Sequence, residues 1–154
     1  MRGYYVPLVA GLVLIASTFL PWINLGDTAL RGMPSLGAIW IAGLGALAVV
    51  LATLSLITRR NSRHPLLVVG LFALGIMVIS WRVLPRSVTD RAQSQSQATA
   101  IVEGGDPDPT PDARVGPGIY TGAAAALAIA LFGLTIVVKR VARPYAVASQ
   151  DDDV

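Results

Sequence analysis

The stretch LGAIWIAGLGALAVVLATLSLI occupies residues 36–57 and contains no charged side chain. It belongs to a run of 27 uncharged residues between Arg31 and Arg59. An α-helix rises about 1.5 Å per residue, so roughly 20 apolar residues cross the ~30 Å hydrocarbon core of a bilayer. The stretch therefore predicts a membrane-spanning helix over about 36–58.

Three further uncharged runs accompany it. They hold 24 residues between Arg2 and Asp27, 18 between Arg63 and Arg82, and 24 between Arg114 and Lys139. The third run is long enough only if Trp81 and Arg82 lie at the membrane interface, with the arginine reaching outward. We predict further spans at about 6–25, 65–84 and 118–138. The expected fold is all-α, a four-helix transmembrane bundle.

Composition supports this prediction and excludes several classes of protein. Of the 154 residues, 54% are hydrophobic and only 14% are charged, whereas a soluble domain has about 25% charged residues. The length fits a single domain, 1–154. There is no cysteine, which excludes disulfides and sulfur-ligated metals. The net charge of +3 comes from basic residues at the ends of the apolar runs, where they would meet lipid headgroups; we expect no nucleic-acid partner.

The distribution of basic residues predicts the orientation. Short flanking segments carry Arg2, Arg59, Arg60, Arg63, Lys139, Arg140 and Arg143. The other side carries five basic residues, three of them interleaved with acids in one long loop. Short basic loops stay in the cytoplasm. Both termini are therefore expected inside, and the first run is expected to remain as a helix because Pro21-Trp22 stands where a signal peptide would have small residues.

Two segments have the composition of polar linkers. The extracytoplasmic loop 85–117 contains a Ser/Gln repeat and an Asp-Pro run, which cannot bury a core, so most of it is expected to be disordered. A short helix within 89–102 remains open, because a faint apolar stripe runs through it. The cytoplasmic tail 144–154 is also expected to be disordered.

Small residues mark the faces on which the helices would pack. The second span has Ala38, Ala42 and Ala46 at intervals of four, and the fourth has Gly118, Gly122, Ala126 and Ala130. Helices in lipid associate through close approach at such residues. The stripes would pack the bundle itself or dock a partner protein, and packing within the bundle is the favoured interpretation.

No constellation of residues predicts catalysis, a metal site or a cofactor. Six hydroxyl residues lie within the apolar runs, and each can bond its own helix backbone: Ser17, Thr18, Thr53, Ser55, Thr121 and Thr135. His64 is the only histidine and precedes a proline at a helix start. Asp106, Asp108 and Asp112 lack the Gly and Glu of a calcium loop. We expect a protein that is not an enzyme and has no cofactor.

Pro21 and Trp22 at the end of the first run are the sharpest local feature. Trp22, Trp40 and Trp81 all lie near the predicted outer boundary, as in an aromatic belt. Proline would end the helix there. Contact with a partner through this corner is the alternative interpretation.

The stretch FLPWINLGDTALRGMPSLGAIW, residues 19–40, resembles small four-span integral membrane proteins of actinobacterial type. The resemblance is one of pattern, and LPW is its only distinctive element. It implies the bacterial inner membrane and no particular activity. Such proteins include accessory subunits of larger envelope complexes, so we expect a non-enzymatic accessory or scaffold subunit whose partners are membrane lipids and another integral membrane protein. An oligomeric transport or lipid-handling protein is the alternative.

Overall fold

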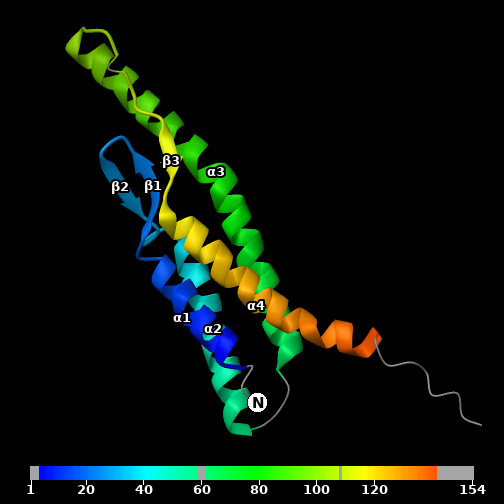
Figure 1. Ribbon diagram of the computed structural model, residues 1–154. Helices are drawn as coiled ribbons and strands as arrows, with labels where there is room; N and C mark the ends of the chain where they lie inside the picture. Colours follow the sequence, from blue (N-terminus) through cyan, green and yellow to red (C-terminus); the bar gives the residue numbers. More distant parts are fainter. Residues whose placement is uncertain (1–3, 59–61, 108, 142–154) are drawn as a thin grey trace, which may run out of the picture.

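The computed structural model describes residues 4–58, 62–107 and 109–141, with only the backbone for 136–141. These residues form four helices, α1 (Tyr5–Ser17), α2 (Leu36–Thr58), α3 (Arg63–Glu103) and α4 (Pro117–Val141). They also form three strands, β1 (Pro21–Leu25), β2 (Thr28–Arg31) and β3 (Ala113–Val115). Figure 1 shows the helices side by side, with the strands at one end of the bundle. We call this the sheet end, and the other the α2–α3 end.

The bundle core forms where each helix packs on two neighbours. α1 lies against α2 and α4, and α3 lies against α4 and α2. Leu14, Ile41, Met77 and Ile129, one from each helix, are fully buried at its centre. The predicted helical bundle is therefore present.

The outside of the bundle is apolar as well. α2, α3 and α4 are long and apolar enough to cross a membrane, and only 28%, 33% and 44% of their most apolar windows are buried inside the chain. The outer face of a helix in a water-soluble bundle would be polar. The chain is therefore built as a membrane protein. α1 is a shorter apolar helix of 13 residues.

Glycines bring the helices into close contact. A Cβ added to Gly45 on α2 would lie 2.8 Å from Cγ1 of Ile15 and 3.0 Å from the carbonyl oxygen of Gly11 on α1. On the other side of the bundle, a Cβ at Gly70 on α3 would lie 2.5 Å from the backbone nitrogen of Ala130 on α4. Both helix pairs therefore approach more closely than larger side chains would allow, as is common between membrane helices.

Most hydroxyl groups in the apolar segments bond to their own helix, as predicted. Ser17, Thr18 and Thr135 donate to carbonyls three residues earlier, at 2.7 Å each. Thr53 and Thr121 donate four residues back, at 2.8 and 3.0 Å. The exception is Ser55, whose buried hydroxyl has no partner among the described residues.

α3 differs most from the prediction. The third span was expected to end near residue 84, before a mostly disordered loop in which a short helix within 89–102 was left open, but the helix continues through Pro85 to Glu103. Its 41 residues correspond to about 60 Å. Residues 91–103 are rich in Ala and Gln, which are good helix formers, so the helix persists without a core. Pro85 costs the hydrogen bond to the carbonyl of Trp81, and the helix ends only at Gly104, whose φ of +72° is left-handed.

The all-α expectation also missed a small antiparallel sheet with strand order β2-β1-β3. β1 and β2 form a hairpin around Gly26, whose φ is +56°. β3 pairs with the free edge of β1, Ile23 opposite Val115. The strands are only three to five residues long. β3 pairs with a strand about 90 residues earlier in the chain and lies in the polar segment 85–117, so no local pattern indicated it.

Gly45→Val tests the α1–α2 contact. The new side chain would meet Ile15 and the backbone of Gly11, and overpacking of this kind costs about 1–3 kcal/mol. We expect a lower thermal unfolding temperature in detergent. Gly43→Val is the matched control, because nothing lies within 4 Å of a Cβ there; equal destabilisation by both variants would contradict the assignment.

Candidate functional site

α1 ends in a turn in which nearby groups bond the backbone carbonyls of Ser17, Thr18 and Leu20. The predicted first span of about 6–25 stops as a helix at Ser17, and β1 begins at Pro21 because proline cannot extend the ladder of helical hydrogen bonds. The carbonyl of Ser17 accepts from the indole Nε1 of Trp22 at 2.9 Å. The carbonyl of Thr18 accepts from the backbone of Met33 at 2.9 Å. Side chain and loop therefore replace the next turn of helix, as an apolar environment requires.

A β-bulge directs Trp22 inward. The pairing of β1 with β2 passes from Pro21 opposite Arg31 to Ile23 opposite Leu30, which leaves Trp22 as the extra residue. Consecutive residues in a regular strand point to opposite faces, yet Trp22 and Ile23 are both 1% exposed. The bulge accounts for this, because such irregularities re-aim a side chain.

Glycines from two other segments surround the indole ring. A Cβ at Gly32 would lie 2.5 Å from its Nε1, and one at Gly118 would lie 2.6 Å from its Cδ1. A Cβ at Gly116 would collide with the backbone of Pro21, and the backbone nitrogen of Gly116 donates to the carbonyl of Trp22 at 2.7 Å. These contacts join α1, the β2–α2 loop and the start of α4. We call Pro21, Trp22, Gly32, Gly116 and Gly118 the tryptophan corner.

This corner differs from the predicted partner contact. The side chain of Trp22 is not on the surface, so it is not accessible to another protein, and Pro21 is half-buried. Trp40 and Trp81 are 59% and 48% exposed, a position that suits an aromatic belt. Sequence reasoning therefore identified the right dipeptide but not its role, because the surrounding glycines are far apart in the chain.

The small-residue stripe of α4 packs inside the chain. Gly118, Gly122, Ala126 and Ala130 are all buried. Gly122 lies against Met77 of α3, and Ala130 lies against Gly70. The favoured interpretation, packing within the bundle, agrees with this arrangement. The structure extends the stripe to Gly133, which lies against Leu67.

The stripe of α2 is divided between two faces. Ala38 is buried, Ala42 is half-buried and Ala46 is exposed. Steps of four residues advance 400°, or 40° beyond one turn, so such a stripe rotates away from a fixed neighbour. The face that packs inward follows alternating steps of three and four: Ala38, Ile41, Gly45, Ala48, Ala52 and Ser55. The prediction that Ala46 packs within this chain is wrong.

Among the predicted topology residues, Arg63 is the one whose side chain is described. Its guanidinium carbon lies 5.5 Å from the centre of the Phe132 ring of α4. Tyr4 meets the same ring edge-on, with 5.1 Å between the ring centroids. Through Phe132, the Arg63 guanidinium of α3 and the Tyr4 ring at the start of α1 are both in contact with α4 at the α2–α3 end. Arg59, Arg60 and Arg143 lie outside the described residues, as does the tail 144–154, and Lys139 and Arg140 are described only as part of the α4 backbone.

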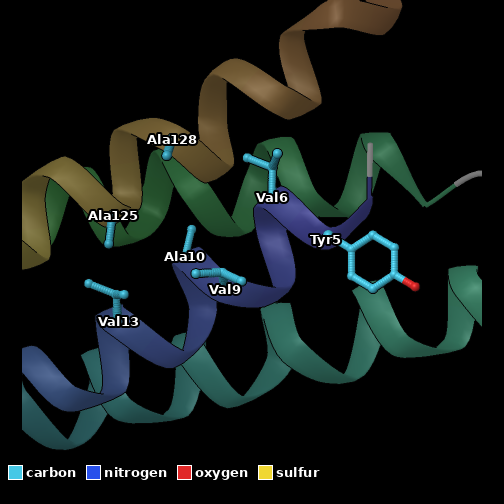
Figure 2. A pocket seen from close by; sticks show the side chains of 7 residues that line it. All are labelled: Tyr5, Val6, Val9, Ala10, Val13, Ala125 and Ala128. Carbon is cyan, nitrogen blue, oxygen red and sulfur yellow. The ribbon is translucent and has the colours of Figure 1, made fainter. Parts of the chain in front are cut away.

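An open apolar groove lies between α1 and α4 (Figure 2). Its volume is about 500 Å³. The residues that line it are Tyr5, Val6, Val9, Ala10, Val13, Ala125 and Ala128. The tyrosine hydroxyl stands at one end and points away from the other lining residues. Nothing in the sequence indicated this groove, since its two walls are more than a hundred residues apart.

Among the described residues, no group of three or more His, Cys, Asp or Glu side chains lies close enough together to hold a metal ion. The buried polar side chains there are Ser17, Thr18, Ser55 and Ser80. The arrangement offers packing surfaces and an apolar groove.

Comparison with protein-family models, with curated proteins and with solved structures gives no match for this chain.

Trp22→Phe tests the tryptophan corner. Phenylalanine keeps an aromatic ring but has no N–H to donate to the carbonyl of Ser17, which retains the longer bond from the backbone of Leu20. The loss of one such hydrogen bond costs about 0.5–1.5 kcal/mol. We expect a lower unfolding temperature in detergent. Trp40→Phe is the control, because Trp40 is exposed; an unchanged unfolding temperature for Trp22→Phe would contradict the role of its indole.

Proposed function

We propose that this protein is a four-span subunit of the bacterial inner membrane that acts as a non-enzymatic accessory or scaffold beside a larger membrane complex. Its outward surface, and not a reaction centre, would carry its function. The observation that carries the proposal is a small-residue face of α2 that its own bundle leaves uncovered.

That face is centred on Gly43 and Ala46. Nothing lies within 4 Å of a Cβ added to Gly43, and Ala46 is exposed. Ile39 and Val50 continue the same face in steps of three and four, and both are exposed. In lipid, small residues gain their stabilising effect when a second helix approaches them closely. A helix of another membrane protein fits this requirement.

The proposal of a fourth span depends on the position of α1 relative to α2. The helix itself covers only about 20 Å. It runs antiparallel to α2, with Gly11 in its middle opposite Gly45 in the middle of α2, and the turn after Ser17 continues its path. This alignment with α2, a helix long enough to span, supports α1 as the fourth span. A bilayer-thinning or snorkelling adjustment accommodates a short span at modest cost.

The proposed orientation places the α2–α3 end in the cytoplasm and the sheet end outside. The basic segment around Arg63 favours the cytoplasm. With that orientation, the half of α3 beyond Pro85 and the three strands form an extracytoplasmic module.

Substitution of the α2 face tests the proposed association. We expect Gly43→Leu and Ala46→Leu to abolish recovery of a co-purifying membrane protein from mild detergent, with monomer stability unchanged. Gly75→Leu on α3 is the matched control, because its surroundings are equally open. Recovery of the unsubstituted protein only as a free monomer, with no companion after in-cell cross-linking, would refute the proposal.

Single cysteines test the orientation, since the chain has none of its own. Ser94→Cys on the far half of α3 should react with a membrane-impermeant maleimide in intact spheroplasts. Ser62→Cys at the start of α3 should react only after permeabilisation. The reverse pattern would overturn the orientation, and labelling of both sites in intact spheroplasts would overturn the number of spans.

A further inference from the structure

We propose that the outer edge of β2 binds an extended segment of another extracytoplasmic protein, which adds to the sheet as a fourth, antiparallel strand. The segment has the pattern acidic-apolar-x-x-basic, where x is any residue that fits a strand. The inference rests on the membrane orientation proposed above, but not on the α2 face, which lies on the membrane-spanning part of the chain.

The outer edge of β2 is uncovered. In the strand order β2-β1-β3, β2 is at one side of the sheet, whereas β3 at the other side lies against α3. Figure 1 shows β2 on the side of the sheet away from α3, and all four residues of β2 are exposed. An open strand edge presents a row of N–H and C=O groups, and an extended chain is the partner that pairs with such a row.

The hairpin determines which backbone groups face this edge. Thr28 lies opposite Leu25 across a two-residue loop, so its backbone bonds to β1. Pairs that exchange hydrogen bonds alternate with pairs that do not along an antiparallel ladder. The N–H and C=O of Ala29 therefore point away from β1, toward the open side of the sheet.

The charges at the two ends of the edge select the sequence of the added strand. Asp27 and Arg31 are both exposed, and opposite charges directly across two strands stabilise their pairing. In an antiparallel segment, the residue opposite Arg31 comes first and the residue opposite Asp27 comes four positions later. A segment with an acidic residue first and a basic residue four positions later therefore fits this edge.

The same charges disfavour a second copy of this chain. The hairpin strands run roughly along the helices in Figure 1, and copies inserted in one membrane share a single direction. Their β2 strands would run parallel, and in register Asp27 would lie beside Asp27 and Arg31 beside Arg31. Like charges directly across two strands are destabilising, so a different protein is the expected occupant.

A small pocket beside β2 accounts for the apolar residue of the pattern. Its volume is about 160 Å³, and its lining includes Trp22, Ile23, Leu30, Leu84 and Val88. A cavity of about 150 Å³ holds a group as large as benzene. Residues directly opposite each other project from the same face of a sheet. The segment's residue opposite Leu30 therefore lies beside this pocket, where an apolar side chain is favoured.

Fluorescence anisotropy of a fluorescein-labelled peptide, Thr-Glu-Val-Thr-Val-Lys-Thr, mixed with the full chain in detergent, tests the edge. We expect binding that Ala29→Pro weakens about tenfold, because proline removes the outward N–H. Ala29→Val is the matched control, since valine keeps the N–H and favours a strand. No binding by the unsubstituted chain, or equal binding by the two variants, would overturn the site.

The peptide with exchanged charges, Thr-Lys-Val-Thr-Val-Glu-Thr, tests the sequence pattern. It has the same composition, so it enters detergent micelles to the same extent. We expect the unsubstituted chain to bind it about fivefold more weakly, and Arg31→Glu, a change at an exposed position, to remove this preference. Equal binding of both peptides by the unsubstituted chain would overturn the charge assignment.

The oligomeric state of the isolated chain distinguishes the other occupant. A dimer that Ala29→Pro dissociates would assign the edge to a second copy and overturn the proposed partner. Because the peptides are added to purified protein, these results are independent of whether the α2 face binds a membrane protein.

Discussion

The buried carbonyl of Ser17 at the end of α1 accepts from the indole of Trp22 at 2.9 Å and from the backbone of Leu20 at 3.3 Å. An unbonded carbonyl in hydrocarbon would cost several kcal/mol, so the chain can reverse here only if donors are supplied. Trp22 supplies the shorter of the two bonds and also fills the space between the helices at the sheet end. Its ring is large, and the bundle closes around it because Gly32 and Gly118 present no side chain. The positions of the β2–α2 loop and of the start of α4 follow from this arrangement.

Small residues also set the distances between helices in the rest of the bundle. α1 meets α2 through Gly11 and Gly45, and α3 meets α4 through Gly70 and Ala130. Since apolar burial between helices gains little in lipid, close packing has to supply the stabilisation. Many large apolar side chains therefore lie on the outside, although Leu14, Ile41, Met77 and Ile129 fill the centre. Small residues also stand uncovered at Gly43, Ala46 and Gly75. Gly43 and Ala46 share one face of α2, which is why that face carries the proposed association.

Sequence patterns predicted the helices far better than their ends or contacts. Uncharged runs located α2 and α4 because length and hydropathy are local properties. The buried α4 stripe was also visible, since Gly118 and Ala130 recur at helical spacing. The sequence interpretation ended α3 too early because it gave more weight to Pro85 and to the polar composition than to the good helix formers after residue 90. The sheet, the glycines around Trp22 and the α1–α4 groove depend on residues distant in the chain, which no local pattern joins.

The continuity of α3 joins two chemically different halves. The helix packs against α4 at Leu67, Gly70 and Met77, and Leu84 and Val88 still pack on the buried core. From Val88 it continues for about 15 residues to Glu103, which is about 22 Å. Because the apolar and polar halves are one helix, the direction of the polar half is set by packing inside the bundle.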